Sequence, residues 1–383
     1  MEFRDLKTQY KKLKQEIDAN LANAIESARF ISGPQVKELE SQLAEYIGVK
    51  HCISCANGTD AITIAMMVWG IGSGDAVFVP DFTFFSSGEC PAFEGATPIY
   101  VDVDSSTYNI DPQQLEAAIE RVKAEGKYKA KAVVSVDLFG LPADYPAIRS
   151  ICDKHGLLLL EDAAQGFGGS INGKLACSFG DISTTSFFPA KPLGCYGDGG
   201  ALFTDNDEWA DLIRSICVHG KDTNNPNDPN AKYNNIRLGM NSRLDTVQAA
   251  ILLPKFKAFK EYELEDVNQV ACWYTDALCD AGIVLPLVKD GYVSSWAQYT
   301  VQLPENVDRN AIQAKLKARG IPTMVYYMKP MHTQGAFAGT DSAAADCPVT
   351  EKLCKTVLSL PMHPYLTKEE AVFVAEELKK ALL

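Results

Sequence analysis

Short apolar runs alternate with amphipathic stretches over the first half of the chain. The apolar runs predict strands at residues 51–55, 76–80, 98–101, 132–136, 157–161, 184–188 and 201–204. Helical periodicity between them predicts helices at 58–69, 112–123 and 143–155. Strands that are apolar along their whole length and separated by helices are typical of a mostly parallel sheet with both faces covered. The sequence therefore predicts an α/β fold in which ligands bind at the carboxyl ends of the strands.

The second half of the chain has a different pattern. A long helical pattern begins after Leu244, and residues 290–383 alternate strands (298–303 and 322–325) with helices (309–319 and 368–382). We expect a large domain over residues 1–245, which includes an N-terminal helical segment, and a smaller C-terminal α/β domain over residues 246–383. Residues 220–235 are polar and rich in Asn and Pro, which predicts a long loop of the kind that is usually functional or disordered.

Composition and charge narrow the class of protein. The chain has 383 residues and a net charge of −13, which argues against general nucleic-acid binding because that needs a basic face. No apolar run approaches the roughly 20 residues of a membrane span, and the first residues lack a signal-peptide layout. We therefore expect a soluble cytoplasmic protein. The eleven Cys are scattered, and Cys52 and Cys55 lie in a predicted buried strand without a second ligand pair, so we predict no metal site.

Two strand ends carry side chains that can take part in a reaction. Glu161 and Asp162 follow four leucines, so at least one carboxylate should lie at the sheet's carboxyl edge. Lys191 lies between the aromatic strand end at 184–188 and a glycine-rich turn. A desolvated lysine favours its neutral, nucleophilic form, which can condense with an aldehyde. An acid at a neighbouring strand end can pair with a pyridinium nitrogen. The alternatives are that Lys191 is a surface turn lysine and that Asp162 caps a helix.

Two further strand ends add a phosphate cradle and an aromatic ring. Residues 56–61 follow a strand and open a helix, and Gly58 lets the backbone approach an anion held by free N–H groups. Phe82, Phe84 and Phe85 follow another strand, and one of these rings could stack on a flat cofactor, although such rings more often belong to the core. A lysine, an acid, a phosphate cradle and a ring at the ends of one sheet are what bound pyridoxal 5'-phosphate (PLP) requires.

The chain resembles the DegT/DnrJ/EryC/StrS family of nucleotide-sugar aminotransferases nearly from end to end. The resemblance is carried by Gly33 and Pro34 and by residues 56–61, 102–111, 161–165, 186–200, 241–245 and 358–364. It implies fold type I of PLP enzymes, with a seven-stranded sheet, and a homodimer with shared active sites. By this resemblance Lys191 forms the Schiff base, Asp162 pairs with the pyridine nitrogen, and Gln165 lies beside the phenolic oxygen. It places Gly58, Thr59 and Ser186 in the phosphate cup, Phe84 on the ring and Asn241 in the partner's site.

Within the family, residues 52–61 and 186–200 are most similar to enzymes that aminate UDP-linked N-acetyl 3-keto hexuronates. Those enzymes carry His-Tyr before a proline-containing substrate segment, where this chain has Tyr326 and Tyr327, followed by His332. Arg243 is our candidate for binding an anionic group of the donor or the sugar, and the alternative is a structural ion pair.

The expected reaction is transfer of an amino group from glutamate, which leaves 2-oxoglutarate, to a UDP-linked 2-acetamido keto sugar. Alternatives are a 4-keto-6-deoxy sugar as substrate, or a PLP-binding regulatory protein without turnover. A PLP-dependent dehydratase would carry histidine in place of Lys191. A nicotinamide dehydrogenase would need a G-x-G-x-x-G motif after the first strand, where residues 56–59 read Ala-Asn-Gly-Thr.

Overall fold

The centre of the protein is a seven-stranded sheet, seen in a computed structural model that describes residues 1–223 and 234–383. The strand order is β1-β9-β8-β5-β4-β2-β3. Only β9 runs antiparallel to its neighbours, so the mostly parallel sheet is confirmed. The bounds are β1 His51–Cys55, β2 Asp75–Pro80, β3 Thr97–Val101, β4 Lys129–Val136, β5 Leu158–Asp162, β8 Ile182–Ser186 and β9 Gly200–Thr204.

Helices cover both faces of this sheet. One face packs against α3 (Gly58–Val68), α4 (Ser86–Phe93) and α7 (Asp207–Ile216). The opposite face packs against α2 (Pro34–Ile47), α5 (Pro112–Glu125), α6 (Tyr145–His155) and α8 (Thr246–Ala258). Because alternate residues of a strand point to opposite faces, Cys52 and Cys55 belong to different sides of the core and do not form one site.

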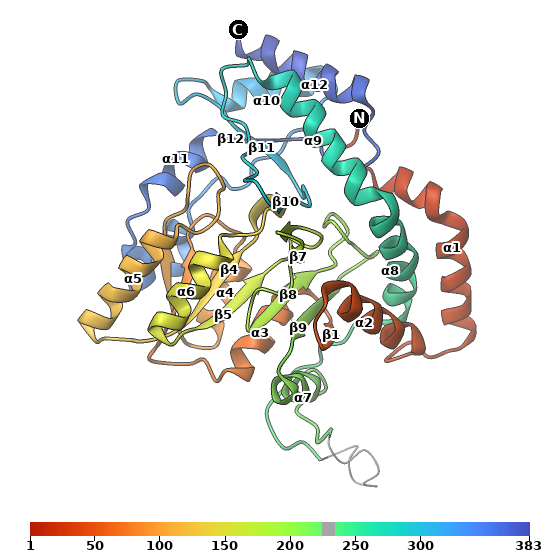
Figure 1. Cartoon of the computed structure of the whole chain (residues 1–383), viewed down its shortest axis with the longest axis vertical. Coiled ribbons are helices and arrows are strands. Elements are labelled where there is room, and N and C mark those ends of the chain that lie inside the picture. The colour runs from red at the N-terminus through yellow and green to blue at the C-terminus, as the bar shows by residue number, and fades with distance from the viewer. Residues whose placement is uncertain (224–233) are drawn as a thin grey trace.

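A smaller C-terminal unit lies above the sheet in Figure 1. It contains the two antiparallel strands β11 (Tyr299–Gln302) and β12 (Val357–Leu360), with α10 (Arg309–Ala318) and α12 (Lys368–Leu382). Helix α11 (Pro348–Thr356) packs instead on the core of the large sheet. Helix α8 continues through a π-helical turn at Phe259–Glu263 into α9 (Leu264–Leu278), which confirms the long helical pattern after Leu244. Helix α1 (Leu6–Glu26) lies beside α8 (Figure 1). A small three-stranded sheet contains β6 (Ser170–Ile171), β7 (Lys174–Leu175) and β10 (Tyr292–Val293).

Two elements of the C-terminal half differ from the sequence prediction. The predicted strand at 322–325 is wrong: within it only Met324 forms an isolated bridge, to Ser359. The partner of β11 is β12, which follows helix α11 without an intervening loop. The domain boundary at residue 245 stays a prediction, and α8, just beyond it, packs on α1 and α2. Most of the predicted loop at 220–235 lies outside the described residues.

Among the described residues, no helix is both long and apolar enough to cross a membrane.

Candidate active site

The sheet topology brings the predicted site residues to one edge. Strands β2, β4, β5 and β8 are parallel, and β1 runs in the same direction because both β1 and β8 are antiparallel to β9. The segments that follow β1, β2, β5 and β8 therefore leave the sheet at its carboxyl edge. Those segments carry Gly58, Phe84, Asp162 and Lys191.

Asp162 is buried at the end of β5. One carboxylate oxygen accepts a hydrogen bond from the Ser87 hydroxyl at 2.9 Å, and the other accepts from the Ala164 N–H at 3.2 Å. Burial raises the pKa of the Asp162 carboxyl, and these hydrogen bonds and the Lys191 charge oppose the rise. The neighbouring Glu161 is held by the Cys177 N–H at 2.6 Å and the Ser183 hydroxyl at 2.7 Å, so its role is structural.

Lys191 lies in a tight turn after β8. Its own N–H donates to the carbonyl of Phe188 at 2.9 Å, and the Cys195 N–H donates to the carbonyl of Phe187 at 2.7 Å. Burial lowers the pKa of the Lys191 amine, and the Asp162 charge opposes this effect. A lowered pKa increases the fraction of neutral amine, which is the form that attacks a carbonyl and accepts a proton.

The start of helix α3 forms a cradle that suits a phosphate. Asn57 caps the helix by accepting the Asp60 N–H at 2.7 Å. A Cβ on Gly58 would lie 2.8 Å from the Cβ of Ser186, so only glycine lets strand β8 approach the helix this closely. The Thr59 and Ser86 hydroxyls lie 2.8 Å apart. Hydroxyls and N–H groups at a helix N-terminus match the donors that a phosphate needs, so the chain fits the cofactor at this position.

Gln165 is fixed between the sheet edge and the C-terminal unit. Its side-chain carbonyl accepts the Phe139 N–H at 2.7 Å, and its amide nitrogen donates to the Tyr327 hydroxyl at 3.2 Å. The ring centroids of Tyr327 and Phe84 lie 6.4 Å apart, and Phe84 is 55% exposed. Tyr327, which we assigned to the substrate, is thus joined directly to two residues assigned to the cofactor.

His332 lies in a buried pair rather than on an open surface. Its Nδ1 lies 2.7 Å from the Asp81 carboxylate, which also accepts the His332 N–H at 2.8 Å. Cys347 completes a buried trio with metal-ligand chemistry, but the Asp81 oxygens are already engaged by His332. This pair holds His332 against Asp81 after β2, and its predicted contact with substrate stays a prediction.

The segment of Asn241 and Arg243 lies against the start of α3. The Ser242 hydroxyl accepts the Ala56 N–H at 3.0 Å, and the Arg243 guanidinium donates to the Asn241 side chain. Asn241 is exposed. Arg243 is half-buried, and its predicted role in binding an anionic group stays a prediction.

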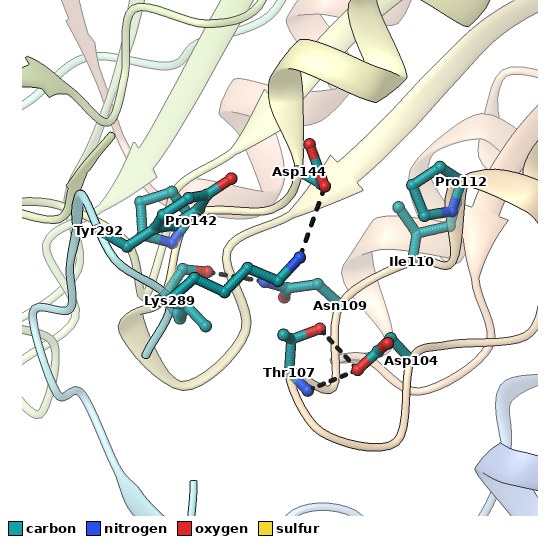
Figure 2. A pocket seen from close by; sticks show the side chains of 10 residues that line it. Asp104, Thr107, Asn109, Ile110, Pro112, Pro142, Asp144, Lys289 and Tyr292 are labelled. Atoms are coloured by element: carbon teal, nitrogen blue, oxygen red, sulfur yellow. Dashed lines mark hydrogen bonds and ion pairs between the residues drawn. The ribbon is translucent and has the colours of Figure 1, made fainter. Parts of the chain in front are cut away.

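A separate hollow of about 40 Å³ lies away from these residues, between the loop after β3 and the start of α6. Figure 2 shows Lys289 reaching toward Asp144, 3.5 Å away, and the Thr107 N–H donating to Asp104 at 2.9 Å. None of the predicted site residues lines this hollow, and it has room only for water-sized molecules.

Sequence reasoning missed two groups that touch the predicted residues. Ser87 holds Asp162, and its signal was the serine pair directly after the aromatic strand end at Phe84 and Phe85. Arg4, 187 residues earlier in the sequence, donates to the carbonyl of Lys191 at 3.0 Å. No local pattern marks Arg4, since only the fold brings it to this turn.

The fold and the site define a PLP-dependent aminotransferase. The chain belongs to the DegT/DnrJ/EryC1/StrS aminotransferase family, whose sequence pattern matches residues 11–379. It is 47% identical over 366 residues, 96% of each chain, to the UDP-2-acetamido-2-deoxy-3-oxo-D-glucuronate aminotransferase of Pseudomonas aeruginosa. It is 39% identical to the UDP-N-acetyl-3-dehydro-alpha-D-glucosamine 3-aminotransferase of Acidithiobacillus ferrooxidans, over 99% of this chain and 97% of that one.

Solved structures agree with this assignment. A DegT DnrJ EryC1 StrS aminotransferase from Brucella abortus is 43% identical, with a TM-score of 0.94 over 99% of each chain. NtdA of Bacillus subtilis, which holds the cofactor in its pyridoxamine form, is 31% identical with a TM-score of 0.86 over 97% of this chain and 82% of NtdA. These comparisons confirm the predicted family, fold class and cofactor.

Proposed function

We propose that this enzyme transfers an amino group from glutamate to the C3 keto group of a UDP-linked 2-acetamido sugar. The observation that carries this proposal is that the two relatives above, at 47% and 39% identity, are both named for amination of UDP-linked 3-keto sugars. The nucleotide supplies binding energy remote from the reaction, which positions the keto carbon.

Each site residue has a role in this proposal. Bound PLP supplies a carbonyl that condenses with amines and a ring that accepts electrons. Lys191 would hold the cofactor covalently, and its amine, when free, would accept and return the proton at the reacting carbon of each substrate. Asp162, oriented by Ser87, holds the proton of the ring nitrogen. Gly58, Thr59 and Ser186 bind the phosphate.

The sugar is proposed to need no carboxylate at C6. The hexuronate enzymes that the chain resembles carry a histidine where this chain has Tyr326, and a tyrosine hydroxyl offers only a neutral hydrogen bond. Loss of a charge-assisted contact costs about 1–2 kcal/mol, or roughly tenfold in discrimination. The Acidithiobacillus relative is named for a glucosamine, so the family includes enzymes for UDP-linked 3-keto sugars without that carboxylate, although the Pseudomonas relative is named for a glucuronate.

The working assembly is proposed to be a homodimer in which Asn241 completes the partner's phosphate cup. The exposed side chains of Phe84, Phe188 and Leu238 support this arrangement, because large apolar groups around a site are usually covered by another surface. Phe84 and Phe188 flank the predicted cofactor, and Leu238 lies three residues before Asn241.

The test is a panel of UDP-linked 3-keto sugars, with and without the C6 carboxylate, and a 4-keto-6-deoxy analogue. Each is incubated with glutamate, products are identified by mass, and kcat/KM is compared. We expect amination at C3, with less than a tenfold preference between the matched 3-keto sugars. A hundredfold preference for the hexuronate would contradict our interpretation of Tyr326, and turnover of the 4-keto sugar alone would contradict the C3 assignment.

A further inference from the structure

An arginine from the N-terminal segment reaches the turn that carries Lys191. The guanidinium of Arg4 donates to the carbonyl oxygen of Lys191 at 3.0 Å and to that of Pro192 at 3.3 Å. Arg4 itself is held in place because the next residue, Asp5, caps helix α1 by accepting the Thr8 N–H at 2.9 Å. The start of α1 thus fixes the direction from which Arg4 approaches the turn.

The far end of the same turn is held by helix α8. The Gln248 side chain accepts the Tyr196 N–H at 2.9 Å and donates to the Tyr196 carbonyl at 3.2 Å. Gln248 therefore fixes residue 196 only, five positions beyond Lys191. Among the described residues, Arg4 is the one whose side chain donates a hydrogen bond to the backbone carbonyl of Lys191.

A buried carboxylate compensates the charge of Arg4. Burial lowers the pKa of the Arg4 guanidinium, and the Glu263 charge opposes this effect. Glu263 is buried and accepts hydrogen bonds from the Gln9 amide, at 2.9 and 3.2 Å, and from the Tyr365 hydroxyl. A charge-assisted hydrogen bond in such surroundings is stronger than one on the surface, so Arg4 is built to hold its two carbonyl partners.

The same segment also contacts the C-terminal unit. The carbonyl of Phe3 accepts the Met362 N–H at 3.0 Å, just beyond strand β12. The ring centroids of Phe3 and Tyr326 lie 6.4 Å apart. Residues 3 and 4 therefore connect the lysine turn with the residue that we assign to the sugar.

We propose that Arg4 is a positioning residue that fixes the backbone of Lys191, and so the path of its side chain, relative to Asp162 and the sugar. This inference rests on the proposed role of Lys191. The amine of Lys191 must reach two reacting atoms in sequence, so the backbone that carries it must be fixed, since a displacement of about 1 Å can cost on the order of 10²-fold in rate. Arg4 fixes this backbone from outside the sheet.

The test compares Arg4→Gln, Arg4→Lys and the matched control Arg121→Gln, whose side chain is 54% exposed on helix α5. Amide hydrogen exchange of residues 188–195 is measured on the cofactor-free protein, together with its melting temperature. On the loaded enzyme, kcat and KM for the keto sugar are measured. For Arg4→Gln we expect faster exchange in this segment and a kcat lower by roughly 10- to 100-fold, with KM changed less than about twofold. Arg4→Lys should lie in between, because lysine keeps the charge and loses the planar pair of donors.

Several outcomes decide the inference. The inference is overturned if the amide exchange rate of residues 188–195 and kcat in Arg4→Gln both stay within twofold of the wild type. This holds even if the melting temperature of the variant is lower. If Arg4→Gln fails to fold, Arg4→Lys decides by the same two measurements. Lys191→Ala separates this inference from the function: an active Lys191→Ala variant refutes the role of Lys191, whereas an inactive one beside a fully active Arg4→Gln refutes only the role of Arg4.

Discussion

A buried lysine under the active-site turn should make the stability of this enzyme depend on alkaline pH. Lys255 of helix α8 is 1% exposed, and its amine lies 4.8 Å from the centre of the Tyr196 ring, without a hydrogen-bond partner among the described residues. Burial lowers its pKa from 10.5 to about 8, although the Glu263 charge opposes the effect. Folding therefore favours the neutral amine.

The magnitude follows from the two pKa values. Below pH 8 both the folded and the unfolded chain hold the proton, and the folded protein bears the full cost of a buried charge. Between about pH 8 and 10.5 the unfolded chain keeps the proton and the folded protein loses it, so the free energy of unfolding rises with pH. Each pKa unit is worth about 1.4 kcal/mol, so the rise amounts to about 3 kcal/mol over this window.

The perturbation is Lys255→Met, which keeps the length of the side chain and removes its titration. The control is Lys257→Met on the same helix, where the side chain is 56% exposed and pairs with Glu16 at 3.3 Å. Urea unfolding of the cofactor-free proteins is followed from pH 7 to 10.5. We expect the advantage of Lys255→Met over the wild type to shrink by about 3 kcal/mol across this range, because any packing change is a constant offset. A difference that stays constant with pH would show that Lys255 remains charged when folded and would refute the reasoning.

Four further predictions test the site itself. Lys191→Ala should bind PLP without the yellow absorbance of the lysine-bound cofactor and should not turn over; normal turnover would refute its assignment. Asp162→Asn should fold and lose activity on the order of 10³–10⁴-fold in kcat, as when a charge-stabilising carboxylate is neutralised, and a change of only a few-fold would identify it as a cap. Gly58→Ala should raise the half-saturating PLP concentration at least tenfold, because its methyl group would displace Ser186; unchanged binding in a titration would refute the cradle. Hybrid dimers of Lys191→Ala and Asn241→Ala subunits should recover activity, since one site then carries neither lesion, and no recovery after confirmed exchange would argue against sharing.

Six strands of the large sheet could be predicted from apolar runs buried on both faces. Strand β8 has the sequence Ile-Ser-Thr-Thr-Ser and ends at Ser186, so the predicted bounds of 184–188 include two Phe that lie beyond it. Asp162 could be found because it ends the apolar run of β5, and Lys191 because it follows that pair of Phe by three residues. Strand β12 could not be predicted, because its partner β11 lies more than fifty residues earlier in the sequence. In addition, β12 begins directly after helix α11, with no Gly or Pro turn signal between them. The pairing of His332 with Asp81 is equally non-local, and the sequence around His332 gives no sign that its partner follows β2.

The hydrogen bond between Phe3 and Met362 has a consequence for the order of events during synthesis. The ribosome releases the N-terminal segment first, and its partner Met362 is translated 359 residues after Phe3. The sheet strands, which lie within the first 204 residues, can pair long before that moment. Contacts between such distant residues also close the largest loops and tend to form late. We therefore expect a new chain to hold a formed sheet, with Lys191 in place but mobile, until Met362 has left the ribosome.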